Sequence, residues 1–176
     1  DAARWRHRRC DLGAGHRGVD MGPSAFRVAG IHESVRDLGI VVEDHGDIEA
    51  EVAETRHPGN PHLKYLKEIR ATCITLRNVV TKTMDEGVIP VVLGGDHSIA
   101  VGSISGIASF AKKKRKNIGV LWIDAHGDLN TPSTSPTGNV HGMPLASLLG
   151  YGPGDLKTVG GNFEKVNPDN VALVGI

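Results

Sequence analysis

Two short apolar runs, each ending in a polar cluster, constrain the fold more than any other feature of the sequence. The first run covers residues 88–93 and ends in a Gly-Gly pair, and the second covers 118–123 and ends directly in Asp124. Runs this short and this apolar are typical of strands that are buried on both faces, as in parallel sheets. The segment between them, 98–110, is predicted to be a helix, which completes a strand–helix–strand unit.

The same alternation is predicted for the first half of the chain. Apolar residues at helical spacing predict one helix over 23–38 and a longer helix over 63–84. Between them, the β-branched run 40–42 predicts a short buried strand that the acidic segment 44–47 stops. The apolar face of the longer helix consists of five residues, Leu66, Ile69, Cys73, Leu76 and Val80.

The second half of the chain continues the pattern. A polar segment at 130–141 is followed by a helix-like stretch at 142–149, and a further strand begins at Val171. This order predicts an α/β fold of three layers, α/β/α, with a mostly parallel sheet that is incomplete at the C-terminal end. We expect residues 1–176 to form a single, truncated domain.

Three potential metal ligands follow the second apolar run at every second position, namely Asp124, His126 and Asp128. Alternate side chains of an extended chain share a face, so these groups can direct oxygen and nitrogen donors toward one point. His97 lies about one strand–helix unit upstream, at the carboxyl end of the first run, where α/β sheets bind ligands. Carboxylates and imidazoles without a thiolate favour Mn²⁺ or a similar divalent ion over structural zinc.

These residues also have ordinary structural interpretations. The 124–128 cluster could be a charged strand end in solvent, but the wholly apolar run before it predicts a central strand. Ionisable groups that converge at a buried strand end need a compensating cation. His97 alone would be a satisfied core histidine, and its place after the Gly-Gly pair favours a ligand. Asp96 is predicted to be a helix cap or a partner of a ligand, because its side chain should point away from the direction of His97.

The polar segment 130–141 leaves the metal motif and ends in His141. Its hydroxyl and amide groups suit either a polar substrate or ordinary turn chemistry, and composition alone does not separate the two. A histidine that is near a metal but not needed as a ligand suits proton transfer near neutral pH. His141 is therefore a candidate catalytic residue, and the candidate substrate-binding residues are Asn130, Ser135, Thr137 and Asn139.

Charge and cysteine content narrow the possible partners. Lys plus Arg and Asp plus Glu number 20 each, which gives no electrostatic reason to expect nucleic acid or an anionic membrane. The basic run 112–116 is interpreted as a solvated helix end rather than an import signal or anion site. Cys10 and Cys73 lack metal-type spacing, which predicts reduced thiols in a cytoplasmic protein. The sequence shows neither a signal peptide nor a run of roughly 18 apolar residues.

Three stretches together resemble the ureohydrolases, and among them the arginase family. They are DLGAGHRGVDMGPSA from Asp11, LGGDHSIAVGSISG from Leu93 and WIDAHGDLNTPSTSPTGNVHGMPLA from Trp122. The resemblance covers 11–176, and the last two stretches are highly specific in combination. The segment 130–141 is similar to the arginase form of this loop. Agmatinases usually differ there, because their substrate has no carboxylate to hold.

The resemblance implies a dinuclear manganese enzyme that converts L-arginine and water to L-ornithine and urea through a metal-bridging hydroxide. By matched position, His97, Asp124 and Asp128 would hold one ion, and Asp124 and His126 would hold the other. Asp128 would also orient the hydroxide, and His141 would be the proton shuttle. Four residues would recognise the α-carboxylate directly or through water: Asn130, Ser135, Thr137 and Asn139.

The resemblance further implies a cytoplasmic protein that forms a homotrimer or homohexamer when complete, with L-arginine as its substrate and neither nucleic acid nor membrane as a partner. Two alternatives stay open at this point. One is another ureohydrolase, such as an agmatinase. The other is a non-catalytic, truncated metal-binding or regulatory chain. A deacetylase-like zinc hydrolase is disfavoured by the form of the 130–141 loop.

The sequence departs from the family pattern at both ends. The family has a Ser-x-Asp-x-Asp motif that supplies two further aspartates, and nothing after Asp128 matches it. We therefore expect weak metal binding and little or no turnover from these 176 residues alone. Residues 1–10 stand where the family has an apolar first strand, and they are interpreted as a shifted or foreign segment. The start at Asp1 and the stop at Ile176, directly after an apolar run, predict a fragment of a longer chain.

Overall fold

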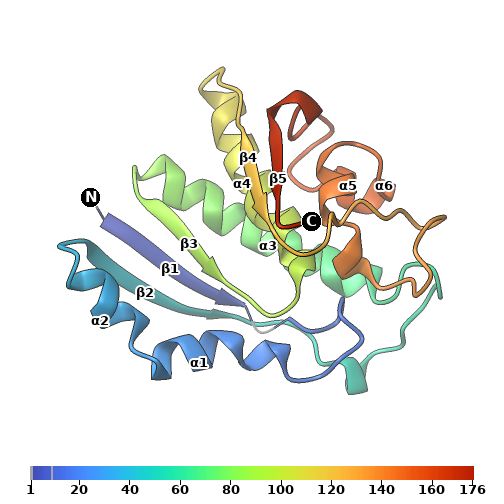
Figure 1. Cartoon of the computed structure of the whole chain (residues 1–176), viewed down its shortest axis with the longest axis horizontal. Helices are drawn as coiled ribbons and strands as arrows, with labels where there is room; N and C mark the ends of the chain where they lie inside the picture. The colour runs from blue at the N-terminus through green and yellow to red at the C-terminus, as the bar shows by residue number, and fades with distance from the viewer. Residues whose placement is uncertain (1, 9) are drawn as a thin grey trace.

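The computed structural model describes residues 2–8 and 10–176, and its strands are all parallel to their partners (Figure 1). β1 lies between β2 and β3 in one sheet, and β4 pairs with β5 in a second sheet. The predicted α/β class with parallel strands is confirmed. The strands are β1 (Ala2–Arg8), β2 (Val41–Ile48), β3 (Ile89–Leu93), β4 (Val120–Ile123) and β5 (Val171–Val174).

The N-terminal segment contains the central strand of the larger sheet. In β1, Ala3 is paired with Val42 of β2 on one side and with Ile89 of β3 on the other. Ala2–Arg8 therefore occupy a strand position in the sheet, which the interpretation of residues 1–10 as a shifted or foreign segment did not predict. The prediction failed because it relied on apolar character, whereas backbone pairing on both edges defines this strand. Residues 1 and 9 lie outside the described part of the chain.

Two short helices, α1 (Gly22–Val28) and α2 (Ile31–Arg36), lie along the β2 edge of this sheet (Figure 1). The sequence predicted a single helix over 23–38. Gly30 has a φ of 76°, a left-handed backbone conformation that interrupts the helix and starts the second one. The prediction was right about the helical region and wrong about its continuity.

The edge strand β2 continues through the acidic segment that was predicted to stop it. Arg27 of α1 pairs with Asp44 at 2.9 Å and with Asp47 at 2.8 Å, so part of the negative charge of the strand is matched from the neighbouring helix. Val41 is exposed, and the prediction of a buried strand at 40–42 was wrong. An edge strand with a solvated face tolerates charged side chains, whereas a buried strand would not.

The larger hydrophobic core forms around α3 (Leu66–Asp85), which packs against α4 (Ala100–Lys113). The predicted long helix is confirmed, and four of its five apolar-face residues are fully buried, namely Ile69, Cys73, Leu76 and Val80. The two helices approach closely at Gly102, where an added Cβ would lie 2.7 Å from the carbonyl oxygen of Cys73. Both cysteines are buried, and neither forms a disulfide among the described residues, as the prediction of reduced thiols requires.

The smaller sheet presents one face to the core and the other to solvent. Trp122 of β4 is buried, but its neighbours Leu121 and Ile123 are 63% and 72% exposed. The prediction that this run is a central strand with two buried faces was wrong for the described residues. β3 likewise lies at an edge of its three-stranded sheet, and β3 and β4 are not hydrogen-bonded neighbours there.

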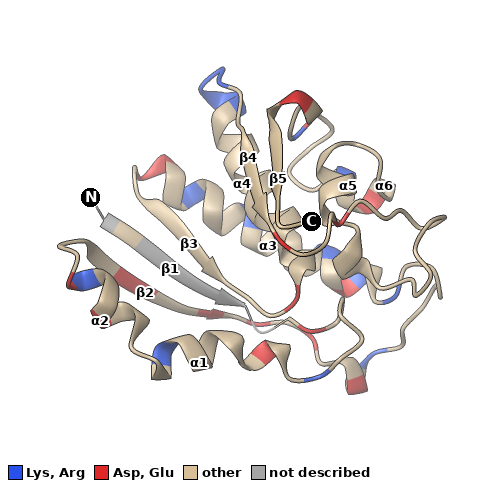
Figure 2. Ribbon diagram, viewed as in Figure 1, with Lys and Arg blue, Asp and Glu red and all other residues tan. Residues whose placement is uncertain are grey.

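Short elements complete the chain: η1 (Val19–Met21), η2 (Ala53–Thr55), η3 (His97–Ile99), η4 (Val140–Gly142), α5 (Pro144–Leu148), α6 (Gly154–Lys157) and η5 (Pro168–Asn170). The basic run 112–116 lies at the C-terminal tip of α4 (Figure 2), and its residues are exposed, which confirms its interpretation as a solvated helix end. No helix in the described ranges combines the length and apolar character that a membrane crossing requires.

Candidate metal centre and its cleft

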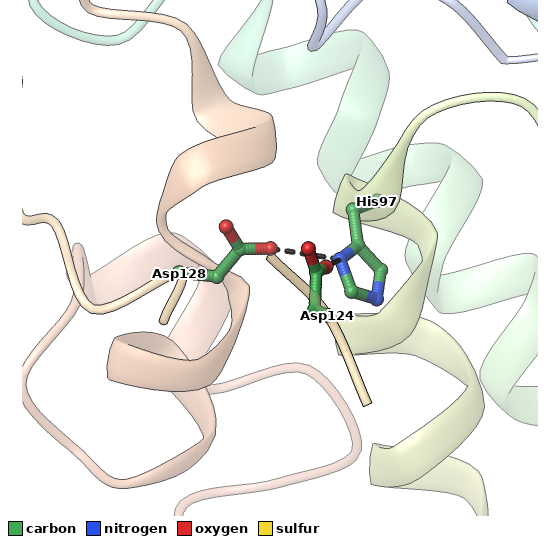
Figure 3. Close-up of side chains that lie close together, drawn as sticks. All are labelled: His97, Asp124 and Asp128. Atoms are coloured by element: carbon green, nitrogen blue, oxygen red, sulfur yellow. Dashed lines mark ion pairs between the residues drawn. The ribbon is translucent and has the colours of Figure 1, made fainter. Parts of the chain in front are cut away.

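Three of the predicted metal ligands converge on one point. His97 Nδ1 lies 2.8 Å from Asp124 Oδ2 and 2.8 Å from Asp128 Oδ2 (Figure 3). One ligand atom from each residue falls within 4.8 Å of the others. His97 comes from η3, and Asp124 and Asp128 both lie in the loop that follows β4, so two segments that are distant in sequence build the cluster.

His97 is held by its backbone and by its ring. Its backbone forms the first residue of η3, which Asp96 caps through a hydrogen bond from the Ser98 N–H to Oδ1 at 2.9 Å. Its imidazole stacks on the indole of Trp122, with the ring centroids 4.5 Å apart and an interplanar angle of 28°. The predicted capping role of Asp96 is thereby confirmed.

The two aspartates are positioned by backbone contacts outside regular structure. The Asp124 N–H donates to the Val174 carbonyl at 3.0 Å, and the Asp128 carbonyl accepts from the Ala146 N–H at 3.1 Å. β4 ends at Ile123, so the expected alternation of side chains along a strand does not operate here. Asp128 instead has a φ of 47°, and this left-handed conformation contributes to the turn of the chain toward the cluster.

His126 lies beside the cluster but does not point into it. Its side chain is 82% exposed, and its Nδ1 is 3.4 Å from Asp124 Oδ1. Its backbone N–H donates to the same Asp124 oxygen at 3.0 Å. Of the four predicted metal ligands, the structure thus gathers three and leaves the imidazole of His126 at the solvent side of Asp124.

The cluster is electrostatically coupled. Burial of the imidazole, the strongest single influence, acts to lower the pKa of His97, but the adjacent carboxylates of Asp128 and Asp124 raise that pKa above its usual value. The pKa of Asp124 is held below its usual value. Burial opposes this shift, and the His126 backbone N–H and the charge on His97 outweigh it. A cation bound here therefore competes with the proton on His97.

The cluster fits a divalent metal ion. Asp128 Oδ2 is buried and receives no hydrogen bond of acceptable geometry from the described residues, although His97 Nδ1 lies nearby. A buried carboxylate oxygen needs a positive partner, which is the His97 imidazolium at 2.8 Å here and would be the metal ion once that proton is displaced. Two carboxylate oxygens and one imidazole nitrogen form a donor set suited to hard or borderline ions such as Mn²⁺.

We expect the 176-residue chain to bind a single Mn²⁺ ion, because the described side chains bring together ligand atoms for one site only. Titration followed by electron paramagnetic resonance, together with isothermal titration calorimetry, would measure the stoichiometry. A value of two ions per chain would show that His126 turns inward and recruits a second ion with Asp124.

All the predicted site residues open onto one cleft of about 910 Å³. The metal cluster lines one part of it, and the polar segment 130–141 lines the rest. The roles of these residues stay predictions, but their common location is a structural fact. The predicted residues that line the cleft are His97, Asp124, His126, Asp128, Asn130, Ser135, Thr137, Asn139 and His141.

The hydroxyl groups of Ser135 and Thr137 in the cleft remain able to donate hydrogen bonds to a ligand. Ser135 Oγ accepts from the Gly138 N–H at 3.0 Å, and Thr137 Oγ1 accepts from the Asn139 N–H at 3.2 Å. A hydroxyl that accepts a hydrogen bond keeps its own proton for another partner. Both side chains are thus oriented by the backbone and equipped to hold an anionic group.

The side chain of Asn139 is partly committed to the protein itself. Its Nδ2 donates to the Ala14 carbonyl at 3.3 Å, and its Oδ1 accepts from Lys64 Nζ at 3.5 Å. One of its two N–H protons remains available to a ligand. Its predicted role in substrate binding therefore stands beside a structural role that the sequence did not indicate.

Sequence reasoning missed two contributors to the site. Trp122 supports the His97 ring, and the segment 10–15 contacts both Asp96 and the loop that ends in His141. The sequence offered a weak signal for Trp122, which stands two residues before Asp124. The family resemblance marked the stretch from Asp11, but it did not indicate the contact with Asp96, which joins residues 83 positions apart.

Comparison with known proteins places these features in one family. The sequence model of the Arginase family matches residues 9–176. The arginase of Brevibacillus brevis is 50% identical over 165 residues, which is 94% of this chain and 54% of that protein. The arginase of Bacillus caldovelox is 47% identical over 167 residues, with the same two coverages of 94% and 54%.

Solved structures agree with the sequence comparison. The structure of Bacillus caldovelox arginase superposes with a TM-score of 0.91 at 44% identity, covering 99% of this chain and 57% of that one. The structure of Entamoeba histolytica arginase in complex with L-ornithine superposes with a TM-score of 0.87 at 31% identity, covering 99% and 58%. The chain spans about half the length of these relatives. By its motifs, its fold and these similarities, the chain belongs to the arginase family.

Proposed function

We propose that this chain supplies the metal-binding and carboxylate-binding half of an active site that hydrolyses L-arginine to L-ornithine and urea. The observation that supports it is the shared cleft, in which a cluster suited to Mn²⁺ faces a loop rich in hydrogen-bond donors. Such an arrangement suits a substrate with a group to be hydrolysed at one end and an anionic group at the other. The family relatives are named as arginases, and one was solved with L-ornithine.

His97, Asp124 and Asp128 would hold the manganese, with His126 available beside Asp124. When bound, the metal would act as a Lewis acid and lower the pKa of a water molecule that attacks the guanidinium carbon. Asp128, the ligand with the most buried carboxylate, would orient that water. As the C–N bond breaks, the leaving δ-amine of ornithine needs a proton, and His141, the cleft histidine that is not a predicted metal ligand, would supply it.

The other end of the substrate would be held by the polar loop. Ser135 and Thr137 each retain a hydroxyl proton, and Asn130 and Asn139 add amide donors in the same cleft. An α-carboxylate fits this set, either directly or through water. Agmatine lacks the carboxylate and would leave these donors without their anionic partner, so L-arginine is the proposed substrate.

The proposal is tested by restoring the missing motif. A chimera that joins this chain to the C-terminal half of Bacillus caldovelox arginase is expected to form urea from L-arginine with Mn²⁺ and to prefer L-arginine over agmatine by about 100-fold or more in kcat/KM. The 176-residue chain alone is expected to show little or no turnover. Asn130→Ala should reduce the preference for L-arginine, while Asn117→Ala, an exposed asparagine outside the cleft, should not.

The alternatives give different results. Equal rates with L-arginine and agmatine would favour the agmatinase interpretation. A chimera that folds and binds Mn²⁺ but makes no urea would favour a non-catalytic metal-binding or regulatory chain, and mixed oligomers on co-expression with a full-length relative would support that role. The single-domain organisation of residues 1–176, assembly as a homotrimer or homohexamer and a cytoplasmic location stay predictions.

A further inference from the structure

The carboxylate of Asp96 joins two parts of the cleft that are distant in sequence. Asp96 is 5% exposed, and its Oδ1 accepts from the Ser98 N–H at 2.9 Å within the turn that carries His97. Its Oδ2 accepts from the Gly13 N–H, also at 2.9 Å. The Asp96 N–H donates to the Cys10 carbonyl at 2.7 Å. Asp96 thereby fixes the metal-binding turn to the segment 10–15.

The segment 10–15 in turn contacts the loop wall of the cleft. The Gly13 carbonyl accepts from the His141 N–H at 3.3 Å, and the Ala14 carbonyl accepts from Asn139 Nδ2 at 3.3 Å. Gly13 is therefore bonded to Asp96 through its N–H and to His141 through its carbonyl. A continuous set of hydrogen bonds leads from the turn of His97, through Asp96 and Gly13, to the backbone of His141.

The packing along this connection leaves no space for additional atoms. A Cβ on Gly13 would lie 2.6 Å from Asp96 Oδ1, and a Cβ on Gly95 would lie 1.8 Å from the Cys10 carbonyl oxygen. At the other end, a Cβ on Gly15 would lie 2.8 Å from Asn139 Nδ2. A displacement of one wall must therefore move the segment 10–15, because close-packed interiors transmit small shifts.

The connection requires a carboxylate. Two acceptor oxygens of Asp96 face two backbone N–H donors, and a carboxylate satisfies both. An asparagine of the same shape would present its amide N–H₂ to one of these donors and leave that donor buried without an acceptor. Asp96 lies outside the metal cluster, so its carboxylate serves this connection and not the ion.

We propose that Asp96 is a positioning residue that couples the orientation of His97 to that of His141 and Asn139 through the segment 10–15. The consequence for catalysis rests on the proposed function. The coupling itself is a property of the folded, metal-free chain, and it can be tested without any turnover.

The test is amide hydrogen exchange on the full chain and its Asp96→Asn variant, measured by NMR without metal. The His141 amide, which Asp96 does not touch, is expected to exchange about 10-fold faster or more in the variant, and so are the Gly13 and Ser98 amides. Mn²⁺ affinity is expected to fall by about 10-fold, the lower end of the effect of changing a group that supports a ligand. The control is Asn167→Ala, which removes the side-chain cap of η5. It should leave the His141 amide and the Mn²⁺ affinity unchanged.

The Gly13→Ala variant perturbs the same hydrogen-bonded connection at Gly13. It replaces Asp96→Asn in the test if that variant does not fold. Its methyl group would lie 2.6 Å from Asp96 Oδ1 and 3.1 Å from Ser98 Oγ, so the readout for this variant is Mn²⁺ affinity, which is expected to fall because a displaced Asp96 moves the turn that carries His97. Unchanged exchange at His141 in the first variant, or unchanged Mn²⁺ affinity in the second, would overturn the coupling. Absence of urea formation in the chimera would overturn the proposed function and leave the exchange result standing.

Discussion

Replacing Asp128 by Asn is expected to weaken Mn²⁺ binding to this chain by about 100-fold or more. Asp128 has the more buried of the two converging carboxylates, with 8% of its side chain exposed, and its Oδ2 lies 2.8 Å from His97 Nδ1 without a hydrogen bond of acceptable geometry from the described residues. Asparagine keeps the shape and removes the charge that holds the ion. Changes to groups that merely support a ligand cost about 10- to 100-fold in metal affinity, so loss of a ligand charge costs at least as much. Calorimetric titration with Mn²⁺ measures the effect.

The matched control for this prediction is Asp155→Asn, which makes the same change in net charge at an exposed position in α6. Its Mn²⁺ affinity should equal that of the parent chain. Thermal unfolding without metal should give cooperative transitions for both variants, which shows that the comparison is between folded proteins. If Asp128→Asn bound Mn²⁺ as tightly as Asp155→Asn, the cluster would be a structural ion pair and not a metal site.

Most residues of the site could be predicted from the sequence, but the backbone path that brings them together could not. Ligand types and spacing identified His97, Asp124 and Asp128, because few other functions place carboxylates and imidazoles directly after apolar runs. The expected strand geometry was wrong, since β4 ends before Asp124 and a left-handed backbone at Asp128 contributes to the convergence. Local sequence indicates which groups are present, whereas the path of a loop depends on its contacts with α5 and β5.

The elements of the fold could likewise be predicted where the signal is local in the sequence, but not where it depends on distant residues. The helix α3 was predictable because an amphipathic helix carries the pattern of its own burial in its sequence. The strand β1 was not, because its place in the sheet depends on partners near residues 41 and 89. The link from Asp96 to Gly13 spans 83 positions and is formed by a backbone N–H, which every residue except proline possesses. The residue types in the sequence therefore do not indicate that this contact forms.

Leu76→Ala is expected to destabilise the chain by about 3 kcal/mol, within the range of about 2–5 kcal/mol for truncating a fully buried leucine. Leu76 of α3 is 0% exposed and belongs to the core cluster that includes Val80 and Val101. Removing its side chain leaves a cavity that the packed α3 and α4 helices cannot fill without moving. Urea denaturation, with equal m-values for the two proteins, measures the loss.

The same substitution at Leu121 tests whether the loss of stability comes from the burial of the leucine or only from its apolar character. Both positions are apolar in the sequence, and both were predicted to be buried, but Leu121 of β4 is 63% exposed. Leu121→Ala is therefore expected to change stability by only about 0.5 kcal/mol. A loss at Leu121 as large as that at Leu76 would mean that the outer face of β4 is covered when the chain is in solution. That result would restore the original prediction of a strand buried on both faces.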